Sequence, residues 1–323
     1  MTILLKWGRN KRLIEPFMLL NLLTSMRYRG WTKNLLVFGA LFFVPGAIFE
    51  TGALLRSFMA FIAFCLIASG TYIINDIADK NRDREHPVKK NRPIASGKLP
   101  VGVAGVFGTL FIIIGFAISI YLDSVPFEIA GFYRVVHIRN ILTFTLLAYL
   151  VMTLLYSLGL KRIPILDVLI IAMGFVMRAV AGAAVLNVQI SQWLLLCTLL
   201  LSVYLALAKR RGEIVELGIS AANHRENLAD YSIPLIDQFL SITAATNIIS
   251  YSLYTFLADY NRGSYLMVTI PMVIFGIFRY QALVTIKGAG ANPEEILLKD
   301  RPIQIDILIW LISVVLILKF GQA

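Results

Sequence analysis

A row of polar residues near position 80 has the spacing of a site that handles a divalent metal and phosphate. Asn75, Asp79 and Asp83 recur every four residues, and Asp76 precedes Asp79 by three, so a helix would place them on one face. Like charges stacked in this way repel one another, and a cation among them removes the repulsion. Carboxylate and amide oxygens suit Mg²⁺, which completes its shell with water and phosphate oxygens. The row therefore predicts a magnesium site.

Basic residues follow the acids closely. Lys89, Lys90 and Arg92 are placed to meet the phosphate groups themselves. The alternative is a solvated loop in which the acids merely balance the bases. The acids keep helical phase and adjoin an uncharged run of residues, which favours the site.

The elements that must position these residues are membrane helices. The chain has 323 residues, of which 58% are hydrophobic and only 15% charged, more apolar surface than a soluble domain can bury. We therefore predict an all-α, polytopic membrane bundle. Apolar runs of spanning length fall near 34–49, 54–74, 101–122, 141–160, 165–186, 190–208, 235–258, 264–286 and 305–320, which predicts about nine transmembrane helices around a polar cavity that faces the cytoplasm.

The distribution of basic residues predicts the orientation of this bundle. The N-terminal segment and alternate loops together hold 23 Lys and Arg residues, and the opposite side holds five. Cytoplasmic loops of membrane proteins usually carry such an excess, so the N-terminus is predicted to be cytoplasmic. The net charge of +11 therefore indicates contact with anionic lipid rather than with nucleic acid.

We predict a basic interfacial segment at residues 1–30 and one catalytic membrane domain at 31–323. Residues 124–140 are predicted to include an external interfacial helix, and Cys65 and Cys197 to be inert thiols.

Two further polar constellations are predicted on the cytoplasmic side. The first runs from Tyr156 through Lys161 to Asp167 and Arg178, and the last two lie nearly three helical turns apart on one face. Ionisable groups within a span normally face the bundle interior or a watery cavity, although a structural ion pair with another helix is an alternative. The second follows the sixth span and includes Lys209, Arg210, Glu213, Arg225 and Tyr231, and its alternative is an ordinary basic loop.

The pattern Asn75-Asp76-x-x-Asp79-x-x-x-Asp83 resembles that of the UbiA-type intramembrane prenyltransferase superfamily. Further segments resemble the branch of that superfamily that transfers phosphoribose to a polyprenyl phosphate. They are Arg29 to Leu35, His86-Pro87, Arg92 to Gly97, Lys161 to Val168, Arg178 to Gly182, Lys209 to Glu213 and Arg225 to Ser232. The resemblance covers roughly residues 25 to 320.

This resemblance implies an integral enzyme of the bacterial inner membrane with nine transmembrane helices and Mg²⁺ as its cofactor. It would transfer 5-phosphoribose from phosphoribosyl pyrophosphate to a decaprenyl-like polyprenyl phosphate and release diphosphate, with the active site on the cytoplasmic side. The implied metal ligands are Asn75, Asp76, Asp79 and Asp83, of which Asn75, Asp79 and Asp83 are the catalytic set. The implied substrate-binding residues are Lys33, Lys89, Arg92, Tyr156, Lys161, Asp167, Arg178, Lys209, Arg210, Glu213, Arg225 and Tyr231.

The chain departs from the superfamily in two respects, the first of which bears on the substrate. The second aspartate-rich motif typical of aromatic prenyltransferases is absent, since Lys209, Arg210 and Glu213 follow the sixth span instead, and 127–140 matches nothing in the family. The first departure favours phosphoribosyl transfer over the alternative, prenyl transfer from a polyprenyl diphosphate to an aromatic or other acceptor. A transporter or channel for an anionic metabolite is a third hypothesis. Helices interrupted at the membrane midplane and pseudo-symmetric halves would favour it, and the sequence shows neither clearly. A homo-oligomer is compatible with any of these.

Overall fold

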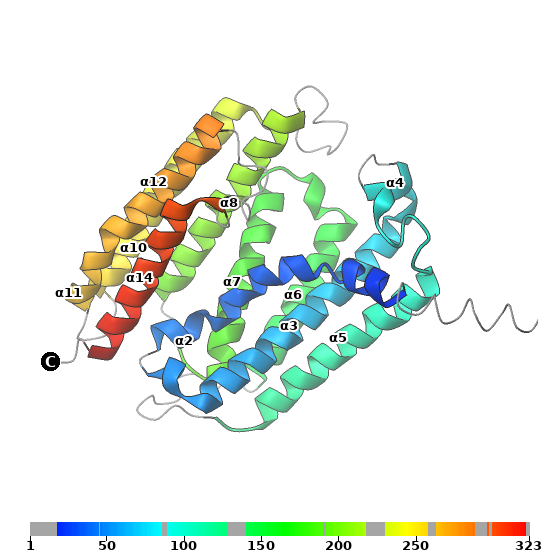
Figure 1. Ribbon diagram of the computed structural model, residues 1–323, viewed down its shortest axis with the longest axis horizontal. Coiled ribbons are helices and arrows are strands. Elements are labelled where there is room, and N and C mark those ends of the chain that lie inside the picture. Colours follow the sequence, from blue (N-terminus) through cyan, green and yellow to red (C-terminus); the bar gives the residue numbers. More distant parts are fainter. Residues whose placement is uncertain are drawn as a thin grey trace, which may run out of the picture. The chain divides into compact units, whose positions relative to one another are not determined.

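The computed structural model describes residues 18–44, 46–85, 89–127, 140–189, 192–217, 230–257, 263–287, 296 and 299–320. Within these ranges the regular structure is helical, as the sequence predicts (Figure 1). The α-helices are α2 (Gly39–Phe43), α3 (Thr51–Ala78), α4 (Lys80–Glu85), α5 (Val101–Ser124), α6 (Ile141–Leu158), α7 (Leu166–Leu186), α8 (Gln192–Leu217), α10 (Ile233–Leu257), α11 (Gly263–Leu266), α12 (Ile270–Lys287) and α14 (Arg301–Phe320). Short 3₁₀-helices are η1 (Tyr28–Phe38), η2 (Ala47–Phe49), η3 (Lys89–Asn91), η4 (Leu160–Arg162) and η7 (Met267–Thr269).

Seven helical stretches in the described part of the chain are long and apolar enough to cross a membrane. They coincide with seven of the nine predicted runs and lie in α3, α5, α6, α7, α8, η7 with α12, and α14. The run at 235–258 forms α10, a helix of 25 residues that carries Asp237 and Gln238 and is not among the seven. The described part of the chain is therefore all-helical, as predicted, and its long apolar helices indicate an integral membrane protein.

The run at 34–49 differs from a single spanning helix. It folds as η1, the five-residue helix α2 and η2 in succession. The backbone of this run packs closely against α7 at Gly182. A Cβ atom at Gly182 would lie 2.1 Å from the carbonyl oxygen of Val37, which belongs to η1. The backbone of η1 can therefore approach α7 this closely only where α7 has no side chain.

The chain divides into two compact units. The first consists of residues 1–35, 58–126 and 139–154, and the second of 36–57, 127–138 and 155–323. In the first unit, Leu22, Met26, Ile73, Ile94, Leu99 and Ala104 form a buried apolar cluster. In the second, α8 packs against α7 and α10, and Tyr204, Leu207, Ile236, Leu240 and Val284 belong to its core. The predicted boundary at residue 30 stays a prediction. The predicted interfacial helix within 124–140 also stays a prediction, because residues 128–139 lie outside the described residues.

Cys65 and Cys197 are both buried, and neither forms a disulfide in the described part of the chain. Their inertness stays a prediction. Trp31 has a structural role in the first unit. Its side chain packs against the apolar cluster of the first unit, and its indole N–H donates to Ser69 Oγ at 3.1 Å. An indole N–H that leaves water needs such a partner, so Trp31 fixes η1 against α3.

Candidate functional site

The predicted acidic row lies on one nearly continuous helical stretch. α3 ends at Ala78 and α4 begins at Lys80, yet the helical hydrogen bonds continue across the junction. The N–H of Asp79 donates to the Asn75 carbonyl at 2.9 Å, and that of Asp83 donates to the Asp79 carbonyl at 2.8 Å. The four-residue spacing read from the sequence is therefore the spacing of successive helical turns in the structure.

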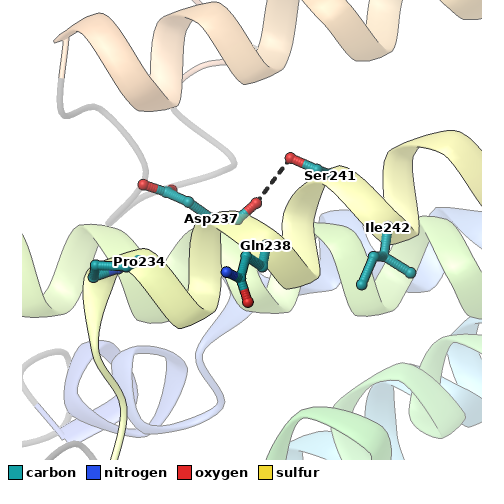
Figure 2. Close-up of a pocket in the computed structure, with 5 residues that line it drawn as sticks. All are labelled: Pro234, Asp237, Gln238, Ser241 and Ile242. Carbon is teal, nitrogen blue, oxygen red and sulfur yellow. Dashed lines mark hydrogen bonds between the residues drawn. The ribbon is translucent and has the colours of Figure 1, made fainter.

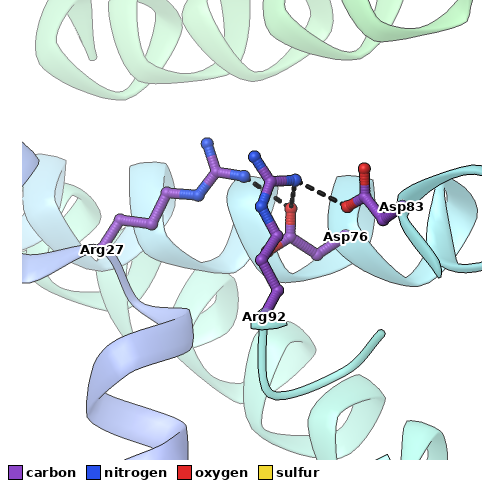
Figure 3. A network of polar contacts seen from close by, with 4 residues as sticks. All are labelled: Arg27, Asp76, Asp83 and Arg92. Atoms are coloured by element: carbon purple, nitrogen blue, oxygen red, sulfur yellow. Dashed lines mark hydrogen bonds and ion pairs between the residues drawn. The ribbon is translucent and has the colours of Figure 1, made fainter. Parts of the chain in front are cut away.

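Two acids of this row are buried and held by arginines (Figure 3). Asp76 is 3% exposed and Asp83 is 2% exposed. Arg92 Nη1 donates to both, at 3.0 Å to Asp76 Oδ1 and at 2.7 Å to Asp83 Oδ2. Arg27 Nη2 donates to the same Asp76 oxygen at 2.5 Å, and its guanidinium lies 4.7 Å from the centre of the Tyr72 ring. We call Arg27, Asp76, Asp83 and Arg92 the arginine–aspartate cluster.

A folded loop positions Arg92 at these acids. The segment after η3 turns back on itself, with the Leu99 N–H bonded to the Pro93 carbonyl at 2.9 Å and the Ser96 N–H to that of Arg92 at 2.9 Å. Gly97 closes the turn at φ +79°, a conformation that glycine adopts without steric cost. Ile94 is thereby buried in the apolar cluster. The run from Arg92 to Gly97 thus aims a guanidinium at Asp76 and Asp83.

The donor chemistry of the row fits Mg²⁺. Asn75 and Asp79 are half-buried, next to the buried Asp76 and Asp83, and all four offer oxygen ligands. Among the described residues, no three His, Cys, Asp or Glu side chains surround a common point. Mg²⁺ is commonly held by one or two carboxylates and completes its shell with substrate phosphates and water. A row of this kind therefore suits a metal that is bound together with a phosphorylated substrate.

A second cluster lies in the second unit and centres on Asp167, which is fully buried. Arg210 Nε donates to Asp167 Oδ2 at 3.0 Å, and Arg210 Nη1 is hydrogen-bonded to Glu213. Tyr231 donates its hydroxyl to Asp167 Oδ1 at 3.1 Å. Burial raises the pKa of Tyr231 to about 12, so the hydroxyl stays protonated and remains a donor at neutral pH. The cluster combines four of the predicted substrate-binding residues.

For Arg210 the structure favours the alternative of a structural ion pair. Its side chain is 2% exposed and that of Asp167 0%, so the pair links α7 to α8 in the interior. Arg178, on the same helix as Asp167, is also buried and donates to the Gly174 carbonyl at 2.6 Å. The prediction that both charges of α7 lie inside the protein is correct.

The other predicted residues are less buried. Lys33, Lys89, Tyr156, Lys161 and Lys209 are each partly exposed, whereas Arg225 lies outside the described residues. Lys33 belongs to η1, Lys89 to η3 and Lys161 to η4. Their long side chains can therefore place an ammonium group near solvent or lipid while the stem remains packed.

Two ion-pair partners were not predicted from the sequence. Arg27 lies 49 positions before its partner Asp76, and only its position just before the Arg29 to Leu35 motif could have signalled it. Asp237 was missed as the partner of Arg211, whose Nε donates to it at 2.6 Å and whose Nη1 donates to the Val284 carbonyl at 3.1 Å. Arg211 thereby ties together α8, α10 and α12.

A shallow depression on α10 is separate from these clusters. It is lined by Pro234, Asp237, Gln238, Ser241 and Ile242, and Ser241 Oγ donates to the Asp237 carbonyl at 2.9 Å (Figure 2). None of the predicted site residues lines it. We therefore assign the chemistry to the charged clusters rather than to this depression.

Comparison with known proteins identifies relatives along nearly the whole chain. Residues 34–295 match the model of the UbiA prenyltransferase family. The chain is 34% identical to the decaprenyl-phosphate phosphoribosyltransferase of Corynebacterium glutamicum, over 91% of this chain and 86% of that protein. It is 32% identical to the enzyme of the same name from Mycolicibacterium smegmatis, over 90% of each chain. A UbiA homolog from Archaeoglobus fulgidus, solved bound to DMAPP and Mg²⁺, shares the fold with a TM-score of 0.66 at 16% identity, over 92% of this chain and 99% of that one.

Proposed function

The chain belongs to the UbiA prenyltransferase family, and from this premise we propose that it transfers 5-phosphoribose from phosphoribosyl pyrophosphate to a polyprenyl phosphate. The observation that carries the proposal is the likeness to two decaprenyl-phosphate phosphoribosyltransferases over at least 90% of this chain. The arginine–aspartate cluster adds a physical reason, because it offers oxygen ligands and guanidinium groups beside one another, as a metal-bound diphosphate requires.

In the proposed reaction the bond between the sugar C1 and the diphosphate oxygen breaks, and a phosphate oxygen of the lipid bonds to C1. The nucleophile is already an anion at neutral pH, so the reaction needs no general base. Mg²⁺, held by Asn75, Asp79 and Asp83 with Asp76, would neutralise negative charge on the departing diphosphate. Arg92 holds both acids through Nη1 alone, and a guanidinium has five N–H donors, so it can bind a phosphate without releasing them.

The direct test incubates the purified protein with Mg²⁺, labelled phosphoribosyl pyrophosphate and a polyprenyl phosphate. We expect a labelled lipid and free diphosphate. A parallel reaction supplies a polyprenyl diphosphate with an aromatic acceptor, which tests the prenyl-transfer alternative. Prenylation of the acceptor without labelled lipid would reverse the assignment.

Lys161 and Lys209 are the proposed ligands of the 5-phosphate of the sugar, since both are partly exposed. Each Lys→Ala change is expected to raise the KM for phosphoribosyl pyrophosphate, or to lower kcat if the contact tightens in the transition state. A charged hydrogen bond to phosphate corresponds to about a ten- to hundredfold change in kcat/KM. Arg162→Ala is the matched control, because Arg162 is an exposed base on the same turn. Wild-type kinetics in both lysine variants would exclude this phosphate pocket.

We propose nine transmembrane spans in a bacterial inner membrane, with the N-terminus and the active site on the cytoplasmic side. The native cysteines are buried, so the wild-type protein gives a low background with an impermeant thiol reagent. In intact cells, Ser96→Cys is expected to be protected from the reagent and Asn261→Cys to react, because positive charge concentrates on the cytoplasmic side. The reverse labelling pattern would contradict this orientation.

A further inference from the structure

The backbone at Ile165 adopts a strained conformation. Its φ is 67° and its ψ is −46°, and the Leu166 N–H donates to the Pro164 carbonyl at 2.7 Å. Together these define a γ-turn of the positive-φ kind, which is rare and strained. A β-branched residue at positive φ is an outlier even among turns. Such strain persists only where the surrounding structure holds it, and it concentrates at functional sites.

Burial of the Ile165 side chain does not offset this strain, because the residue is 51% exposed. A polar relay holds the backbone instead. The Ile165 N–H donates to Tyr231 Oη at 2.6 Å, although Tyr231 lies 66 positions later in the chain. Tyr231 in turn donates to Asp167, which is paired with Arg210. The position of each group in this chain of hydrogen bonds therefore depends on the group that follows it.

This relay fixes the turn that precedes α7. η4, which contains Lys161 and Arg162, ends two residues before Pro164. The carbonyl of Ile163 accepts the Asp167 N–H at 3.1 Å, so the turn and the first residues of the helix form one hydrogen-bonded unit. A displacement of the backbone at Ile165 would move Lys161 relative to Asp167. Misplacement of a binding group by about 1 Å can have a large effect on catalysis.

We propose that Tyr231 is a positioning residue whose hydroxyl holds the strained turn at Ile165 and thereby places Lys161 for the sugar phosphate. The last step rests on the proposed function. Tyr231 itself needs no contact with the substrate. The strain at Ile165 specifies one position for the turn, and the Tyr231 hydroxyl stabilises that position against relaxation to an ordinary backbone conformation.

The test begins with Tyr231→Phe, which removes the hydroxyl and keeps the ring. The KM for phosphoribosyl pyrophosphate is expected to rise about three- to tenfold, the effect of losing one hydrogen bond. The KM for the polyprenyl phosphate and kcat are expected to change less. Tyr280→Phe is the matched control, because the Tyr280 hydroxyl is buried in the same unit and has no hydrogen-bond partner among the described residues.

A second substitution separates positioning from a general loss of stability. Ile165→Gly removes the Cβ that makes positive φ costly, so the turn no longer requires the hydroxyl to hold it. When Ile165→Gly is combined with Tyr231→Phe, the KM for phosphoribosyl pyrophosphate is expected to return most of the way to the wild-type value. If the double variant stayed as impaired as Tyr231→Phe, the hydroxyl would act by another route and the proposal would be wrong. A wild-type KM in Tyr231→Phe would overturn it as well.

Hydrogen exchange of the Ile165 amide provides a readout that does not depend on activity. We expect faster exchange in Tyr231→Phe than in the wild type, and no change in Tyr280→Phe. If the wild-type protein formed no labelled lipid, the proposed function and the role of Lys161 would fail together. The exchange rates would still decide whether Tyr231 holds the turn, and unchanged exchange in Tyr231→Phe would exclude it.

Discussion

Asp79→Asn and Asp83→Asn are each expected to reduce turnover at least about a hundredfold, the effect of removing a group that stabilises developing charge. Asparagine keeps the shape of the side chain and removes the charge that would hold the metal. The labelled-lipid assay measures the loss, and size-exclusion chromatography in detergent checks that the variants are folded. Asp237→Asn is the control, since Asp237 is an ion-paired acid outside the row.

The two variants differ in one informative way. Asp83 is ion-paired with Arg92 at 2.7 Å, so Asp83→Asn weakens the arginine–aspartate cluster, whereas Asp79 is partly exposed. Asp83→Asn should therefore lower thermal stability more than Asp79→Asn does, because loss of a buried ion pair costs more than loss of a contact at a partly exposed group. Full magnesium-dependent activity in both variants would exclude the proposed metal ligands.

Asp167→Ala is expected to have the largest effect on stability. It removes one of the two carboxylate partners of the buried Arg210 guanidinium, the other being Glu213, and also the acceptor of the Tyr231 hydroxyl. Breaking a buried ion pair at one partner typically destabilises a protein by about 3–5 kcal/mol, because the remaining charge stays desolvated. Glu213 still compensates part of the Arg210 charge, so we expect a loss toward the lower end of this range. Thermal unfolding in detergent should show a large decrease in Tm.

Replacing both partners provides the control for this prediction. Asp167→Leu combined with Arg210→Met removes both charges of the buried pair, and well-packed apolar replacements of buried ion pairs are often close to neutral. Glu213 loses Arg210 as a partner, but its side chain is 22% exposed and can be solvated. We expect the double variant to recover much of the lost Tm without recovering activity. A double variant less stable than Asp167→Ala would show that the cost of removing Asp167 does not arise from the uncompensated charge of Arg210.

The local spacing of charges was predictable, and their partners were not. Asn75, Asp76, Asp79 and Asp83 follow the helical period, which depends only on neighbouring residues, so the sequence predicted their common face correctly. Arg27 pairs with Asp76 across 49 positions, and Arg92 reaches Asp76 and Asp83 through a loop closed at Gly97. Such pairings depend on how the chain packs, which no local pattern encodes.

The pattern of apolar residues likewise predicted only part of the fold. It located the seven helical stretches in the described residues that are long and apolar enough to cross a membrane, because their hydrophobic runs are long. It did not reveal that the run at 34–49 folds as η1, α2 and η2, where the approach of Val37 to Gly182 constrains the backbone. The strained turn at Ile165 was equally hidden, since isoleucine is a residue that local preference would not place at positive φ.

The arginine–aspartate cluster has a consequence for how an anionic substrate would approach. Its two carboxylates and two guanidiniums have formal charges that sum to zero. Beyond a Debye length, about 8–10 Å in salt, four such balanced charges produce almost no field. Long-range attraction must therefore come from the excess of basic residues elsewhere in the chain, whose net charge is +11. Ionic strength would then govern the rate of encounter, while the shielded contacts within the cluster would respond to it far less.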